Sequence, residues 1–225
     1  MMFPLNHGVM SAANATESSY PVTTGLVGLW DWKELDGLSN GEGFSSFPDA
    51  SGNGNDLTCS GPMLYYDAGY VDTNLNRGEA FDILGGLSNI KTTPFSMVIR
   101  VHDTVSNNSD NRLTGFNINR GAELLYGYAA DNTIRFNNGN VPFTGKASPP
   151  GTGTYCFVNH GDGTITIYVD GVLDTGPASI PTGDVPDIFE VGRFGWESQF
   201  VFAALHDVAL NDAEIAAIHN YAIGA

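Results

Sequence analysis

TITIYVDGVL, residues 164–173, is the stretch of this sequence that decides its fold. Ile165, Ile167 and Val169 alternate with polar or aromatic neighbours, which is the period-2 pattern of a strand with one buried face. Asp170-Gly171 then supplies the positive φ angles of a two-residue turn, and an apolar pair begins the return strand. The stretch therefore predicts an antiparallel hairpin.

Short strands of the same kind are expected along most of the chain from Gly25 onward, separated by turn clusters rich in Gly, Asn and Ser. A first strand should contain Leu26, Leu29, Trp30 and Trp32. The other expected strands are 63–71, 79–84, 95–102, 112–119, 123–128, 133–137, 155–159, 164–170, 188–191 and 200–208. Many short strands with regular turns are typical of a two-sheet sandwich.

One helix is expected, from residue 212 to about residue 221. Asn211 can cap its first turn, and Glu214, three residues later, can complete a capping box. Ile215 and Ile218 share one face at helical spacing. The helix should pack on the sandwich and close the domain.

Three segments resemble, in this order, the laminin G-like branch of the concanavalin A-like lectin/glucanase superfamily: LWDW at 29–32, the hairpin at 164–173 and ALNDAEI at 209–215. The resemblance covers about residues 25–223. It implies an all-β, concanavalin A-like jelly-roll sandwich of two antiparallel sheets with one short C-terminal helix. Residues 25–225 would form this domain and residues 1–24 an extended N-terminal arm. Trp30 and Trp32 would lie in the core, and we expect Asp31 between them to face solvent.

Composition limits the classes of partner. Twenty-eight glycines and 11 prolines, with 15% charged residues, fit an all-β protein with many tight turns. Twenty-five acidic against nine basic residues give a formal net charge of −16, which repels phosphate backbones and anionic lipid headgroups. We therefore expect neither nucleic acid nor membrane as a partner. An acidic surface also offers oxygen ligands to hard cations.

A candidate calcium loop, FPDASGNGND at 47–56, resembles the Asp-x-Ser-Gly-Asn-Gly-Asn segment of the same family. Asp49, Asn53 and Asp56 gather side-chain and main-chain oxygens there, which are the ligands that Ca²⁺ prefers. The prediction is a structural calcium ion and no other cofactor. The alternative is that these Asx side chains only bond the backbone amides of their own turn.

Two cysteines, Cys59 and Cys156, lie far apart in the sequence, each in or beside an apolar strand. They show neither zinc-ligand nor redox-motif spacing. One long-range disulfide and two buried free thiols both fit this pattern, and the sequence leaves the choice open.

Catalytic patterns are weak. Glucanases of the superfamily carry carboxylates at alternate positions of one strand, so that two of them face one sugar. The nearest acidic clusters here are Asp31 with Glu34 and Asp36, and Glu190 with Glu197. The sequence also has no histidine pair at helical zinc spacing. We therefore expect a protein that is not an enzyme.

Exposed aromatic rings could stack on sugar rings. Trp196 is the leading candidate for glycan binding because glycines flank it in an expected loop, and Tyr126 and Tyr128 project to one side of their strand. The alternative is that these rings pack in the core or at its rim.

The predicted function combines these features. No apolar run is long enough to span a bilayer, and the N-terminus lacks the basic region of a signal peptide. The leading hypothesis is a structural protein of a virion, a capsid decoration or fibre assembled in the host cytoplasm. Its N-terminal arm would dock on capsid or tail subunits, or on another copy in a homo-oligomer, through Phe3, Leu5, Val9 and Met10. The alternative is a free-standing carbohydrate-binding module, secreted and able to bind a cell-surface glycan; a glycan hydrolase is the third class.

Overall fold

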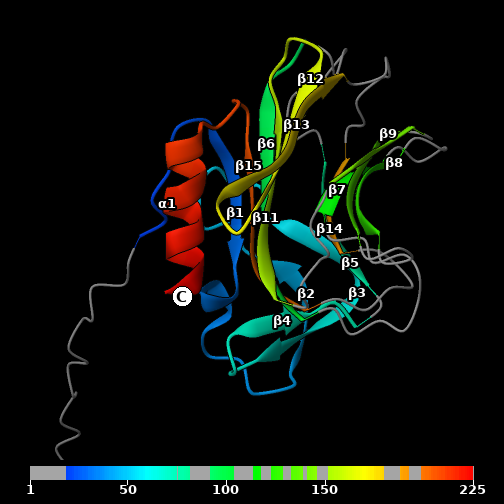
Figure 1. Ribbon diagram of the computed structural model, residues 1–225. Helices are drawn as coiled ribbons and strands as arrows, with labels where there is room; N and C mark the ends of the chain where they lie inside the picture. Colours follow the sequence, from blue (N-terminus) through cyan, green and yellow to red (C-terminus); the bar gives the residue numbers. More distant parts are fainter. Residues whose placement is uncertain are drawn as a thin grey trace, which may run out of the picture.

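The computed structural model describes residues 19–74, 76–81, 92–103, 114–117, 123–128, 133–138, 141–145, 152–179, 188–192 and 199–224. Short strands dominate these ranges, and one α-helix follows the last strand (Figure 1). The elements are β1 (Leu26–Asp31), η1 (Trp32–Leu35), β2 (Gly43–Phe47), β3 (Leu57–Tyr66), β4 (Tyr70–Asp72), β5 (Arg77–Phe81), β6 (Phe95–Asp103), β7 (Thr114–Asn117), β8 (Glu123–Tyr128), β9 (Thr133–Asn138), β10 (Val141–Thr144), β11 (Gly153–Asn159), β12 (Thr164–Val169), β13 (Val172–Ser179), β14 (Ile188–Gly192), β15 (Gln199–His206) and α1 (Asp212–Ile223).

The strands form an antiparallel sandwich, which confirms the expected all-β fold. One layer has the order β1-β15-β6-β11-β12-β13, and the other has β10-β9-β8-β7-β14-β5-β3-β2. Strand β4 pairs with both β3 and β15, so the hydrogen-bonded ladder passes from one layer to the other there.

The hairpin predicted from residues 164–173 is present as β12 and β13. Asp170 and Gly171 have φ angles of 50° and 76°, the two positive values that the turn requires. Gly171 also approaches α1 so closely that a Cβ added to it would lie 2.9 Å from Cβ of His219. The turn is tied to β11 as well, because the amide of Thr154 donates a 2.9 Å hydrogen bond to Oδ1 of Asp170.

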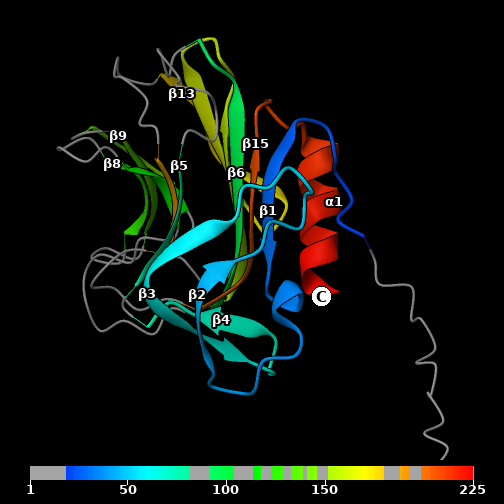
Figure 2. The same cartoon turned by 180° about the vertical axis from the view of Figure 1, so that it is seen from behind.

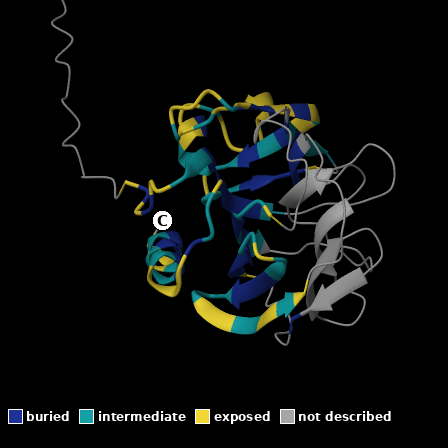
Figure 3. Cartoon of the chain, turned by 90° about the horizontal axis from the view of Figure 1, so that it is seen from above, coloured by how far each residue is buried: buried dark blue, intermediate teal, exposed yellow. Residues whose placement is uncertain are grey.

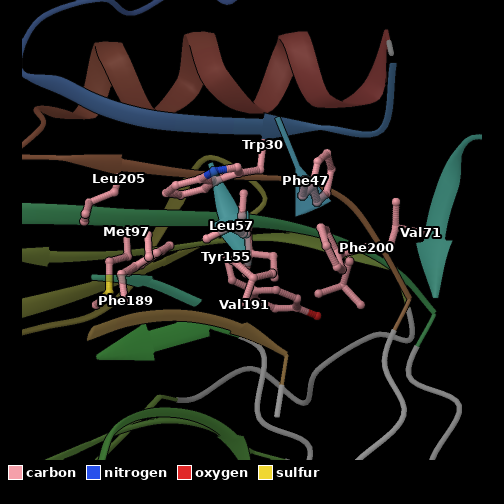
Figure 4. Close-up of a cluster of buried hydrophobic side chains, with 14 of the residues drawn as sticks. Trp30, Phe47, Leu57, Val71, Met97, Tyr155, Phe189, Val191, Phe200 and Leu205 are labelled. Atoms are coloured by element: carbon pink, nitrogen blue, oxygen red, sulfur yellow. The ribbon is translucent and has the colours of Figure 1, made fainter. Parts of the chain in front are cut away.

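The main core fills the space between the two layers. Trp30 projects from β1 and stacks on Phe189 of β14, with ring centroids 5.1 Å apart and planes 22° apart (Figure 4). Phe47, Leu57 and Phe200 are also fully or almost fully buried in this cluster. Trp30 is therefore a core residue, as expected, and the stack joins the two sheets.

Helix α1 covers the outer face of the β1-β15-β6-β11 layer, so this layer is buried on both sides (Figures 1 and 3). Its buried face consists of Ile215, Ile218 and Ala222. The predicted capping box is present: Oδ1 of Asn211 accepts from the amide of Glu214 at 3.1 Å, and Oε2 of Glu214 accepts from the amide of Asn211 at 2.9 Å.

The segment just before β1 belongs to this helix-side layer. Tyr20 and Val22 are buried with α1 and β15, at 9% and 6% exposure, although they lie in the range expected to be an arm. Among the described residues, the packed part of the chain therefore begins at Tyr20.

The expectation that Asp31 faces solvent was wrong. Asp31 is 3% exposed, because α1 covers the face of β1 that would otherwise be the wet side of the sandwich. Trp32 is half-buried and packs against both hydrophobic clusters, but it starts η1 and does not continue the strand.

Cys59 and Cys156 are both buried free thiols. Burial raises the pKa of the Cys59 thiol to about 12 and also raises the pKa of Cys156. Within the described ranges, no helix is both long and apolar enough to cross a membrane.

Candidate functional site

A pocket of about 400 Å³ lies where β1, η1, the segment before β1 and the C-terminal turn of α1 meet. This volume is in the range of small-molecule sites. Tyr20, Leu26 and Leu29 supply apolar surface, and the polar or charged side chains that line the pocket include Asp31, Lys33, Glu34, Ser51 and Tyr221. The pocket thus combines aromatic and aliphatic walls with both hydrogen-bond donors and acceptors.

Asp31 is the buried acceptor of this pocket. Its Oδ2 accepts a 2.6 Å hydrogen bond from the hydroxyl of Tyr221, and its Oδ1 accepts one of 3.1 Å from the amide of Lys33. The second bond caps η1 and fixes where the Lys33 side chain starts. Asp31 therefore positions a ring from α1 and a cation from η1 in one pocket.

Lys33 places its Nζ 5.5 Å from the centroid of the Tyr221 ring. In the part of the chain that the structure describes, this ammonium has no carboxylate partner within ion-pair distance. Glu34, exposed on the next position of η1, adds a carboxylate to the rim. A ligand hydroxyl in the pocket could thus accept from one residue and donate to another.

A buried Tyr–His pair holds the segment that forms one wall of the pocket. Nδ1 of His206 lies 2.9 Å from the carbonyl oxygen of Thr24, and Nε2 lies 3.1 Å from the hydroxyl of Tyr20. Since a carbonyl only accepts, Nδ1 carries the proton and Nε2 accepts from Tyr20. Burial lowers the pKa of His206, and burial raises the pKa of Tyr20, with smaller contributions from Cys156 and Tyr221.

The predicted calcium loop lies along the free edge of β1. Oδ1 of Asp49 accepts from the amides of Leu29 and Ser51, both at 2.9 Å, and Oδ2 accepts from the Ser51 hydroxyl at 2.8 Å and the Asn55 amide at 2.9 Å. Every one of these donors is a protein group. The Asp49 carboxylate thus makes the turn and strand-edge hydrogen bonds of the alternative interpretation.

The other two predicted calcium ligands are engaged in the same way. Asp56 accepts from the amide of Asp49 through Oδ1 at 2.8 Å, and the Asn53 amide group donates to the carbonyl of Leu26 at 2.8 Å. No group of three or more His, Cys, Asp or Glu side chains within the described ranges is arranged to hold a metal. The calcium ion stays a prediction.

Several predicted site residues cannot be placed. Trp196 and the arm residues Phe3, Leu5, Val9 and Met10 lie outside the described residues. Tyr126 and Tyr128 belong to β8, where the structure describes the strand but not the side chains. Of the acidic clusters, Asp31 and Glu34 share the pocket, whereas Glu197 is also outside the described residues.

Glu190 instead lies beside a carboxylate that belongs to neither predicted acidic cluster, that of Glu79. It lies directly opposite Glu79 on β5, and Nε of Arg77 is 3.1 Å from Oε1 of Glu190 and 2.8 Å from Oε1 of Glu79. Arg77 thus bridges the two carboxylates across the β5–β14 strand pair.

Comparisons with known proteins find likeness in structure alone. No protein-family model and no curated protein sequence matches the chain. Among solved structures, Trypanosoma rangeli sialidase is similar with a TM-score of 0.65 at 15% identity, over 89% of this chain and 33% of the sialidase. The chain thus spans about a third of that enzyme.

Two separate domains are similar as well. Domain 4 of AbnA, an extracellular GH43 arabinanase from Geobacillus stearothermophilus, in complex with arabinotriose, has a TM-score of 0.60 at 15% identity, over 86% of this chain and 98% of that domain. The binding domain of botulinum neurotoxin DC, in complex with SialylT, has a TM-score of 0.61 at 15% identity, over 89% of this chain and 52% of that one. At these identities the likeness establishes the β-sandwich fold.

Proposed function

We propose that this chain is a non-catalytic carbohydrate-binding module and that a sugar residue occupies the pocket beside Tyr221. The observation that carries the proposal is the pocket itself: an aromatic ring, a buried carboxylate and a lysine without a carboxylate partner among the described residues face one space of about 400 Å³. The fold agrees with this use, since two similar domains were solved as complexes with arabinotriose and with SialylT.

The chemistry of the pocket favours a neutral sugar. Each sugar hydroxyl both donates and accepts, and the pocket offers the carboxylates of Asp31 and Glu34 as acceptors and Lys33 as a donor. The Tyr221 ring, together with Leu26 and Leu29, provides surface for the C–H groups of a pyranose or furanose. Two carboxylates beside one ammonium, on a chain of formal charge −16, disfavour an anionic sugar.

The virion hypothesis depends on the predicted arm of residues 1–24, of which residues 1–18, including every predicted docking residue, lie outside the described residues. None of the similar structures named above is that of a virion protein. The observations therefore favour the carbohydrate-binding alternative, which predicts binding that is independent of any assembly.

Binding to a glycan array, followed by calorimetric titration of the ligands found, tests the proposal. Lys33→Ala should weaken binding about tenfold or more because it removes a charged hydrogen-bond donor, and Glu34→Gln should also weaken binding because it replaces a charged acceptor by a neutral one. Asp207→Asn is the matched control, because it removes an exposed carboxylate that does not line the pocket. Unchanged affinity in both pocket variants would place the sugar elsewhere, and no binding to any glycan would reject the function.

A further inference from the structure

Three planar side chains from three strands form a stack at the surface. Tyr66 of β3 and Tyr70 of β4 have ring centroids 4.8 Å apart and planes 16° apart. His102 of β6 continues the stack, with its ring centroid 4.3 Å from that of Tyr70 and its plane 10° away. We call Tyr66, Tyr70 and His102 the aromatic ladder.

The ladder is not part of either hydrophobic core cluster. All three residues are half-buried, so part of each is in contact with water. Tyr66 and Tyr70 are direct cross-strand partners, and their contact stabilises the β3–β4 hairpin. His102 comes from β6, so the cross-strand contact of the hairpin does not explain its place in the stack. In a stack of three, each outer ring keeps one face that no other ladder ring covers, and Tyr66 and His102 are the outer rings.

Element η1 connects the ladder to the Tyr221 pocket. Lys33 and Glu34 of η1 line the pocket, while the ring of Trp32, at the start of η1, lies against the tip of the β3–β4 hairpin. A Cβ added to Gly69 at this tip would be 3.7 Å from the Trp32 ring. Both views of the ribbon show the hairpin next to η1 (Figures 1 and 2).

Trp32 adds a second, independent observation at this place. Its Nε1 is buried and has no hydrogen-bond partner among the described residues. A buried donor without an acceptor costs free energy, and such a group is usually satisfied by water or by a ligand. The edge of the indole that carries Nε1 is the edge nearest Gly69, so this donor lies on the side of Trp32 that faces the β3–β4 hairpin.

We propose that the aromatic ladder is a second sugar-binding surface, which holds further residues of the same neutral polysaccharide whose first residue occupies the Tyr221 pocket. The proposal rests on the proposed function. Flat ring faces and edges suit the apolar C–H surface of a sugar. Nucleobases also stack on such rings, but nucleic acid brings phosphates, which the formal charge of −16 and the exposed Asp67 beside the ladder repel.

The test compares long and short ligands on the full chain. The probes are linear arabinan, xylan, mixed-linkage β-glucan and mannan in affinity gel electrophoresis, and the corresponding trisaccharides in calorimetry. Tyr66→Ala and His102→Ala should each reduce retardation by the bound polysaccharide about three- to tenfold and leave the affinity for its trisaccharide unchanged. Tyr66→Phe keeps the ring and should behave as wild type. Leu173→Ala is the matched control, since it removes another exposed apolar side chain, on β13.

The possible outcomes separate this proposal from the proposed function. Loss of polysaccharide binding in the pocket variants alone, with folded ladder variants like wild type, would overturn the ladder and keep the function. Loss in the ladder variants alone would reject the pocket and with it the joint site, and would leave the ladder as a separate sugar-binding surface. If wild-type protein is retarded by none of the four polysaccharides, the ladder proposal fails, and the glycan array decides the proposed function separately. Thermal unfolding of Tyr66→Ala and His102→Ala shows whether they fold; if either does not, Tyr66→Leu and His102→Leu, which keep bulk without an aromatic face, decide the question.

Discussion

The hydroxyl of Tyr221 in α1 donates a 2.6 Å hydrogen bond to Oδ2 of Asp31 at the end of β1, although 190 positions separate the two residues. The bond fastens the last helix to the first strand. It also satisfies a carboxylate that is only 3% exposed and fixes one wall of the pocket. Removing this hydrogen bond should therefore lower both the stability of the fold and the affinity of the pocket.

We expect Tyr221→Phe to lower the free energy of unfolding by about 1–3 kcal/mol, because the buried Asp31 loses its side-chain donor while the ring stays in place. Urea denaturation measures the change. Tyr66→Phe is the control, since the Tyr66 hydroxyl makes no hydrogen bond among the described residues. Equal losses in the two variants would mean that the Tyr221–Asp31 hydrogen bond does not contribute to the free energy of unfolding.

Local features of this fold could be predicted from the sequence. The Asp170-Gly171 turn and the capping box of Asn211 and Glu214 depend on residues within four positions of each other, and both are confirmed. Residues 63–71, expected as one strand, are instead the end of β3 and the start of β4. Apolar residues lie on both sides of the turn, and only Asp67 and Gly69, the latter with a φ of 96°, mark the break.

The pocket could not be predicted in this way. The alternation around Asp31 indicates a solvent-facing side chain, and it is the later packing of α1 and Tyr20 on β1 that buries it. The ladder depends on His102 meeting the β3–β4 hairpin across the fold. Non-local contacts of this kind leave no periodic signal, whereas Asp31 between Trp30 and Trp32 is a local sign that this edge is unusual.

The Asp49 carboxylate should matter for stability with or without calcium. Asp49→Ala removes the acceptor of four hydrogen bonds, three of them from backbone amides, and we expect a loss of about 2–4 kcal/mol in the free energy of unfolding. Thermal unfolding in Ca²⁺ and in chelator is the measurement. A loss of the same size in both solutions fits the hydrogen bonds. A rise in melting temperature with Ca²⁺ that Asp49→Ala abolishes would support the predicted metal site.

His206 should make the free energy of unfolding decrease in mild acid. Because burial lowers the pKa of His206 below its ordinary value of about 6.5, the unfolded chain binds this proton more readily than the folded chain. The contribution of the neutral His206 is therefore complete above pH of about 6.5. It decreases as the pH falls below that value, until the lowered pKa of the folded state is reached.

The measurement is the free energy of unfolding of wild type and His206→Gln between pH 5 and pH 8. Glutamine keeps a donor and an acceptor but does not titrate, and the remaining histidines are common to both proteins, so the difference isolates His206. We expect wild type to lose more stability than His206→Gln between pH 6.5 and pH 5. Parallel curves would contradict the lowered pKa.

Two N-terminal truncations separate the packed segment from the arm. Removing residues 1–18 keeps Tyr20 and Val22, and we expect the free energy of unfolding to stay within about 0.5 kcal/mol of the full chain, as for surface changes. Removing residues 1–24 deletes both side chains and leaves Nε2 of the buried His206 without its donor. The expected loss is about 3–5 kcal/mol, comparable to truncating a large core side chain.

The full chain with Tyr20→Ala and Val22→Ala is the matched control for this loss, because it removes the same contacts and keeps the length. Light scattering on the 1–18 truncation then tests the predicted assembly arm without disturbing the fold. A defined oligomer of the full chain that this truncation dissolves would assign self-association to Phe3, Leu5, Val9 and Met10 or their neighbours. If the 1–24 truncation had the same free energy of unfolding as the full chain, the packing of Tyr20 on His206 would not stabilise the fold. The wall that this segment gives the pocket would then not be needed for stability either.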